Sequence, residues 1–364
     1  MARRPVLMRL ALLGGALIAS LLAAEVLFRC CGPAQGGFKG AGTFYTPTGV
    51  EIPVAEIANF LSGGGYMSDS DMEHPYGRLT PGLEVKLGYD RPQWDYFDAQ
   101  DCVLVKHNSR GYRDDEFPVQ KPVGEFRVLA FGDSFTYGQG VRAEDAWPNL
   151  LELELRKHGP AQVVNCGFAC GCYTPRGYDD WMQSDGLLLS PDLVIVGLCL
   201  NDMEAKANDV PMLSYPVEKP EHYPSALLEY AVATYKWRMA RRKVTDFTAV
   251  VKRDPSGWLA TQDGLRNLKA ICDRAGIGLV VAVFPMLSQL DCDPYPFAGL
   301  MAMAVDFCRE AGIACVDLGP DFIGRDDEMD LWVHPTDQHP NHVAHRMMCD
   351  RIHAFLGEQK LLPR

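Results

Sequence analysis

The chain has 364 residues, of which 47% are hydrophobic and 23% are charged, and these are ordinary values for a folded globular protein. Its formal net charge of −12 and the lack of a long basic run argue against binding to nucleic acid or to anionic lipid. The length allows one large domain, or one domain with an additional part.

The first predicted element is a hydrophobic helix close to the N-terminus. Arginines at positions 3, 4 and 9 precede an uncharged run, Leu10–Ala24, that is rich in Leu, Ala and Ile. A helix over residues 10–28 would be roughly 28 Å long, close to the thickness of a bilayer core. The preceding positive charge predicts a transmembrane signal anchor over residues 1–31, with the bulk of the chain exported to the periplasmic or extracellular side. A cleaved signal peptide is the alternative, and it predicts the same export.

Residues 32–123 are predicted to form a linker and an N-terminal extension packed on the main domain. Gly, Pro and Ser are frequent up to Ser70, and short apolar runs such as Cys102–Val105 then alternate with turn residues. We interpret the polar stretch His107–Arg113 as a turn held by Asn and Gly, and the lining of a cleft is the alternative.

Residues 124–364 are predicted to form the main domain. Apolar runs indicate strands at Val128–Phe131, Val163–Asn165, Leu193–Leu200, Leu279–Phe284 and Ala314–Leu318. Helical patterns between or after them cover Trp147–His158, Leu259–Arg274, Met301–Ala311 and His342–Leu356. Alternating strands and helices predict an α/β fold in which helices cover both faces of a parallel sheet. A long insertion at about 202–257, with a helix at Ala226–Lys243, separates the third and fourth strands.

The 12 cysteines do not follow the paired C-x2-C spacing of zinc sites. Cys166, Cys170 and Cys172 are close together, but most cysteines stand in apolar surroundings, where a small buried hydrophobe is the usual role. Some would be able to pair in an exported domain, although the pattern does not indicate which. No metal site and no cofactor is predicted.

A serine stands where the first strand of the main domain ends. The strand Val128–Phe131 runs directly into Gly132-Asp133-Ser134. Such a turn can hold a hydroxyl at the carboxyl edge of the sheet, where open α/β folds place their sites. Serine is a weak nucleophile unless a base takes its proton. Three later blocks contain candidate partners: Val164–Gly171, Leu200–Asp202 and Pro335–Asn341.

The order of these four blocks resembles the SGNH hydrolase superfamily, the GDSL-type esterases and lipases. The resemblance covers roughly residue 126 to the end, and the segments Asn108–Arg113 and Gly124–Arg127 are similar to membrane-anchored bacterial members. It implies a three-layer α/β/α sandwich of flavodoxin-like type with a mainly parallel sheet. It also implies a serine esterase.

The resemblance assigns catalytic roles to three residues. Ser134 would attack the ester carbonyl, His339 would act as the general base, and Asp337 would orient His339. Asp337 stands two residues before His339, whereas the family's acid stands three before, where this chain has Thr336. If Asp337 does not reach the imidazole Nδ1, a backbone carbonyl would orient His339 instead. The spacing and the Pro-Asn that follows favour His339 over His334, His342 and His345.

The oxyanion hole would contain the Ser134 backbone N–H, a glycine N–H and the Asn201 side-chain amide. Gly171 fits the family's glycine with one inserted residue, because it stands six residues after Asn165, and Gly167 is the alternative. We expect hydrolysis of an O-acetyl or other short acyl ester on a carbohydrate or an envelope polymer. The alternatives are an SGNH-type O-acyltransferase acting on an envelope polysaccharide and a non-catalytic envelope binding module.

Overall fold

The computed structural model divides the chain into two compact units, residues 1–39 with 217–243 and residues 40–216 with 244–364. The structure describes residues 3–31, 42–53, 79–89, 92–168, 175–204, 223, 225–229, 231–232, 235, 246–335 and 337–363. Most of the predicted insertion, including much of its helix, lies outside these residues.

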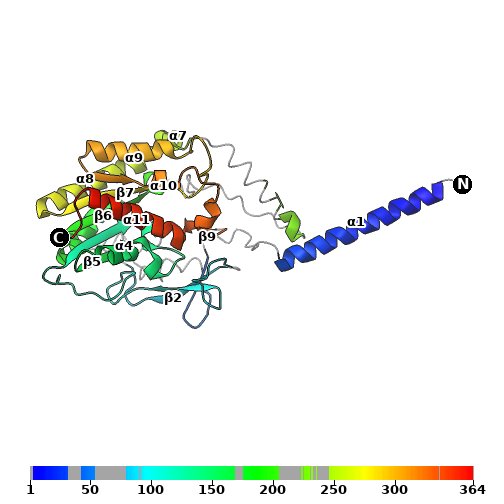
Figure 1. Cartoon of the computed structure of the whole chain (residues 1–364), viewed down its shortest axis with the longest axis horizontal. Helices are drawn as coiled ribbons and strands as arrows, with labels where there is room; N and C mark the ends of the chain where they lie inside the picture. The colour runs from blue at the N-terminus through cyan, green and yellow to red at the C-terminus, as the bar shows by residue number, and fades with distance from the viewer. Residues whose placement is uncertain are drawn as a thin grey trace. The chain divides into compact units, whose positions relative to one another are not determined.

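The first unit contains the long helix α1, Arg3–Cys31, where the sequence predicted a helix (Figure 1). Near its end, Glu25 pairs with Arg29 at 2.6 Å and accepts hydrogen bonds from the Ser225 hydroxyl at 2.7 Å and the Ala226 N–H at 2.8 Å. Within the described part of the chain, no helix has the length and apolar character that a membrane crossing requires. The prediction of a transmembrane helix and signal anchor is therefore not supported, and the last turns of the segment instead carry an ion pair.

Five parallel strands form the centre of the second unit, in the order β5-β4-β6-β7-β8. Their bounds are β4 Phe126–Gly132, β5 Ala161–Gly167, β6 Leu193–Cys199, β7 Gly278–Phe284 and β8 Ala314–Asp317. β4, β5 and β6 are buried along nearly their whole length, which is why they appear in the sequence as continuous apolar runs. The predicted α/β fold with a parallel sheet is confirmed.

The helices of the second unit form two packed groups (Figure 1). Their bounds are α3 Ser134–Tyr137, α4 Trp147–Leu155, α5 Pro175–Trp181, α7 Thr248–Arg253, α8 Ser256–Ala275, α9 Ala298–Glu310, α10 Gly319–Phe322 and α11 His342–Glu358. Arg346 of α11 pairs with Glu154 of α4 at 2.6 Å, and the Trp258 ring of α8 meets the Phe307 ring of α9 at 5.5 Å. Because crossovers between parallel strands are right-handed, α4 lies on one face of the sheet and α5, α8 and α9 on the other.

Two small antiparallel sheets complete the second unit. The first has the order β1-β2-β3, with bounds β1 Thr43–Tyr45, β2 Glu84–Gly88 and β3 Cys102–Lys106. The second is the hairpin of β9 Trp332–His334 and β10 Asp337–Pro340. The Trp94 indole N–H donates to the Trp332 carbonyl at 2.8 Å, so the segment after β2 is tied to the hairpin.

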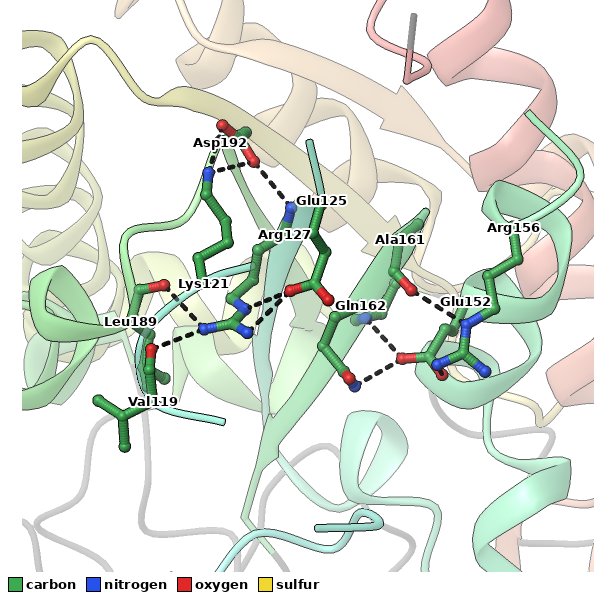
Figure 2. A network of polar contacts seen from close by, with 11 residues as sticks. Val119, Lys121, Glu125, Arg127, Glu152, Arg156, Ala161, Gln162, Leu189 and Asp192 are labelled. Carbon is green, nitrogen blue, oxygen red and sulfur yellow. Dashed lines mark hydrogen bonds and ion pairs between the residues drawn. The ribbon is translucent and has the colours of Figure 1, made fainter. Parts of the chain in front are cut away.

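A polar network joins the amino ends of the central strands (Figure 2). The guanidinium of Arg127, which is fully buried at the start of β4, pairs with Glu125 at 2.8 Å and donates to the carbonyls of Val119 and Leu189. The Asp192 carboxylate, just before β6, accepts from the Arg127 backbone N–H at 2.8 Å and from Lys121. These contacts hold the start of β4 against that of β6, at the edge of the sheet opposite to the carboxyl ends of the strands.

Among the described residues, the thiols of Cys102, Cys166, Cys199, Cys272, Cys308, Cys315 and Cys349 form no disulfide. Most are buried, as expected for small hydrophobes, and only Cys292 and Cys315 are partly exposed. Cys170 and Cys172 lie outside the described residues.

Candidate active site

Ser134 begins the short helix α3 directly after β4. Asp133 caps this helix, because its carboxylate accepts a hydrogen bond from the Phe135 N–H at 2.9 Å. Gly138, in the left-handed conformation with φ 81°, ends the helix and donates its N–H to the Ser134 carbonyl at 3.0 Å. Capping at both ends fixes Ser134 at the carboxyl edge of the sheet.

Glycine at two strand ends lets α3 lie close against the sheet. A Cβ on Gly132, which has φ 157°, would stand 2.0 Å from the Thr136 hydroxyl. A Cβ on Gly167, at the end of β5, would stand 2.2 Å from the Tyr137 backbone nitrogen. Any larger residue at these positions would push the helix and its serine away.

Ser134, His339 and Asp337 lie in one hydrogen-bonded row. The Ser134 Oγ is 2.9 Å from His339 Nε2, and His339 Nδ1 is 2.5 Å from Asp337 Oδ1. Because an ionised carboxylate only accepts hydrogen bonds, Nδ1 carries the hydrogen, and Nε2 of the neutral ring is left to accept from the serine. The two-residue spacing between acid and base therefore does reach Nδ1, through the irregular strand β10. A backbone carbonyl is not needed to orient the ring.

The charges in this row stabilise one another. Burial alone lowers the pKa of His339, but the charge and hydrogen bond of Asp337 outweigh it, so this pKa is raised above 6.5. Burial alone raises the pKa of Asp337, but the charge of His339 and hydrogen bonds from His339 and Tyr89 outweigh it, so this pKa is lowered. An imidazolium formed by proton transfer from Ser134 would thus be stabilised where it forms.

The other C-terminal histidines have different surroundings. His334 is buried and stacks on Tyr89 at 5.4 Å between ring centroids. His342 packs edge-on against the ring of Tyr96. His345 is buried in α11 and accepts from the Trp147 N–H at 3.2 Å, and its burial lowers its pKa to about 3. Only His339 among these four contacts Ser134 within the described residues.

The candidate oxyanion donors are only partly brought together. Within the described part of the chain, the Ser134 backbone N–H has no hydrogen-bond partner, as expected for a first-turn helix position. The Gly167 N–H already donates to the Asn165 side-chain oxygen at 3.0 Å, so Gly167 is not free to bind an oxyanion. Gly171 lies outside the described residues.

Asn201 follows β6 and contacts the turn that contains the serine. Its amide nitrogen donates one hydrogen to Asp133 Oδ2 at 2.9 Å, which leaves the second hydrogen of the amide for another acceptor. Burial raises the pKa of Asp133, and the hydrogen bonds from Asn201 and Phe135 and the charge of His339 oppose that rise. Asp133 therefore links the serine turn to the end of the neighbouring strand.

Sequence reasoning missed two residues that contact this site. The Tyr89 hydroxyl donates to Asp337 Oδ2 at 2.6 Å. The fully buried Arg113 guanidinium donates to the carbonyls of Tyr137, Gly138 and Val141, at the C-terminal end of α3. Arg113 ends the stretch Asn108–Arg113, which the sequence singled out, but nothing in that stretch indicated a contact with the serine helix. Tyr89 belongs to no motif or periodic pattern.

The stretch 107–113 forms the turn that the sequence predicted. The Asn108 side-chain oxygen accepts from the backbone N–H groups of Arg110 and Tyr112, both at 3.0 Å, and Gly111 has φ 89°. The same stretch also contacts the serine helix, because His107 Nε2 lies 2.8 Å from the Tyr137 hydroxyl.

Comparison with known proteins gives a family and several similar structures. The model of the GDSL-like lipase/acylhydrolase family matches residues 130–347. Similar solved structures include a two-domain esterase, CEX, active on acetylated mannans, with 13% identity and TM-score 0.42, and the match covers 65% of this chain and 49% of that chain. TesA has 15% identity and TM-score 0.41, with 64% of this chain and 98% of that chain covered.

A catalytic mutant of Axe2, an acetylxylan esterase from Geobacillus stearothermophilus, has 15% identity and TM-score 0.39, and the match covers 65% of this chain and 97% of that chain. This chain therefore spans about half the length of the mannan esterase and nearly the full length of the other two. Comparison with curated proteins gives no match.

Proposed function

Because this chain belongs to the GDSL-like lipase/acylhydrolase family and is an ester-hydrolysing enzyme, we propose that it acts through an acyl-serine intermediate on Ser134. The observation that carries the proposal is the row formed by Ser134 Oγ, the His339 imidazole and the Asp337 carboxylate, with contacts of 2.9 and 2.5 Å. A serine hydroxyl bonded to an oriented imidazole is the arrangement that nucleophilic catalysis requires.

The steps follow from the positions of the protons. Ser134 Oγ attacks the ester carbonyl while its proton passes to His339 Nε2, and the imidazolium is stabilised by Asp337. The negative carbonyl oxygen is met by the Ser134 N–H and the remaining amide hydrogen of Asn201. His339 then gives its proton to the leaving alcohol, which leaves the acyl group on Ser134. Water, activated by the same imidazole, releases the acid and restores the serine.

The contact between Asp337 and His339 argues against a non-catalytic binding module. The unusual spacing of these two residues was the only feature of the sequence that favoured such a module. Asp337 nevertheless bonds to the ring at 2.5 Å and to the His339 backbone N–H at 3.1 Å, so both partners of a working base are present.

For the substrate, we propose an O-acetyl or other short acyl ester on a carbohydrate or an envelope polymer. Support comes from the family and from the resemblance of the segments Asn108–Arg113 and Gly124–Arg127 to membrane-anchored bacterial members of the superfamily. The basic residues and uncharged run at the N-terminus support the further proposal that the catalytic part is exported. A C-terminal phosphatase fusion, which becomes active only after export, tests the location.

Labelling with an organophosphonate serine probe tests the mechanism. The full chain, Ser134→Ala and His339→Ala are compared by intact mass, and the hydrolysis of aryl acetates and acetylated oligosaccharides is followed in parallel. One adduct on the wild type, absent in Ser134→Ala and slow to form in His339→Ala, is expected. Hydrolysis by folded Ser134→Ala at the wild-type rate would refute the acyl-serine mechanism. Adding a glycan acceptor distinguishes hydrolysis from acyl transfer. An acyltransferase would form acylated glycan faster than free acid.

A further inference from the structure

Tyr89 contacts the candidate acid from outside the region that the family model matches. It follows β2 of the sheet β1-β2-β3, whereas the family match begins at residue 130. Its hydroxyl donates to Asp337 Oδ2 at 2.6 Å. The ring is buried, stacks on His334 at 5.4 Å and meets the edge of Phe97 at 5.6 Å. Packing on two sides therefore holds the hydroxyl in place.

This hydrogen bond satisfies the one carboxylate oxygen that the histidine does not use. Oδ1 of Asp337 accepts both the His339 backbone N–H at 3.1 Å and the ring Nδ1–H at 2.5 Å. The Asp337 side chain is only 2% exposed, and Tyr89 is the partner of its Oδ2 among the described residues, so without the tyrosine this oxygen would lose that donor while buried on a charged group. The carboxylate would then gain by rotating toward any other donor, and rotation would misalign Oδ1.

The same N-terminal segment also holds the nucleophile. Arg113 donates to three carbonyls at and after the end of α3, the helix that Ser134 begins. Residues before the family match thus contact both ends of the hydrogen-bonded row, the serine helix through Arg113 and the acid through Tyr89. This agreement between two separate contacts indicates that the segment is part of the site.

We propose that Tyr89 is a positioning residue, which fixes the plane of the Asp337 carboxylate so that Oδ1 faces His339 Nδ1. The sheet β1-β2-β3 and the residues that follow it are then a component of the active site. The inference rests on the proposed function of Ser134, His339 and Asp337.

Tyr89→Phe tests this role, because it removes the hydroxyl and keeps the ring. Tyr96→Phe is the matched control: Tyr96 is equally buried in the same segment, and its hydroxyl has no hydrogen-bond partner among the described residues. Both variants are made in the full chain, and thermal unfolding checks that they fold. The measurements are kcat, KM and the proton NMR signal of the His339 Nδ1–H, which a short bond to a carboxylate shifts far downfield and which His339→Gln identifies.

If Tyr89 positions Asp337, removing its hydroxyl should change kcat and the NMR signal but not KM. In Tyr89→Phe we expect kcat to fall about tenfold with KM unchanged, and the downfield signal to move upfield or disappear. Tyr96→Phe should match the wild type in all three measurements. A folded Tyr89→Phe with wild-type kcat and an unmoved signal would overturn the inference. The NMR signal does not need turnover, so a wild type that shows it but hydrolyses no ester would refute the proposed function and not the role of Tyr89.

Discussion

Replacing Gly167 by alanine should displace Ser134, the proposed nucleophile, without changing any of the residues proposed to react. The new Cβ would stand 2.2 Å from the Tyr137 backbone nitrogen, whereas ordinary contacts begin near 3.4 Å. The difference between 3.4 and 2.2 Å requires a shift of about 1.2 Å between β5 and α3. Because α3 begins with Ser134, the hydroxyl moves relative to His339. Displacements of about 1 Å can cost roughly 100-fold in rate, so we expect kcat to fall by about that factor.

The assay is the hydrolysis of an aryl acetate, with thermal unfolding as the measure of folding. Gly159→Ala is the matched control, because a Cβ there would meet only Pro363 at 4.0 Å. It should retain wild-type kcat. A folded Gly167→Ala with kcat within twofold of the wild type would show that the close approach of β5 does not set the position of the serine, and would refute the reasoning.

Three further predictions concern the base, the oxyanion and the far edge of the sheet. The pKa of His339 is raised, and only its neutral ring accepts a proton, so kcat/KM should increase with pH through a midpoint above 6.5. A measured midpoint at or below 6.5 would contradict this prediction. Asn201→Ala should lower kcat about 100- to 1000-fold and leave probe labelling of Ser134 possible, which kinetics and intact mass together check. Arg127→Met should lower the free energy of unfolding, measured in urea, by about 3 kcal/mol, because the Glu125 carboxylate loses its partner. We expect kcat to stay unchanged, and a change would show that the amino edge of the sheet influences the site at the carboxyl edge.

Much of the fold could be predicted because strands buried on both faces have an unambiguous pattern. Leu193–Cys199 is apolar throughout and entirely buried, and its predicted range differs from the observed one by a single residue. The strand order β5-β4-β6-β7-β8 could not be predicted from such patterns, because a local apolar run does not indicate which other strand it pairs with.

For the candidate site, the sequence indicated the residues that belong to the four motif blocks. It missed Tyr89 and Arg113, which contact the site only in the folded chain. Ser134, Asn201 and His339 each follow or precede a strong element in a recognisable order. The distance between Asp337 and the ring could not be judged from spacing, because the register of β10 against β9 shifts between Asp337 and Pro340. Tyr89 stands in none of the recognisable blocks, and its partner lies 248 residues away, so no local pattern could join them.

That separation of 248 residues has a consequence for how the enzyme matures during synthesis. Ribosomes add about 5–20 residues per second, so Tyr89 is added to the chain roughly 12 to 50 s before Asp337, which accepts its hydrogen bond. During this interval the tyrosine hydroxyl has no carboxylate to bind, and the serine helix has no histidine. Under the proposed mechanism, a nascent chain gains esterase activity only after the hairpin β9-β10 has emerged and docked.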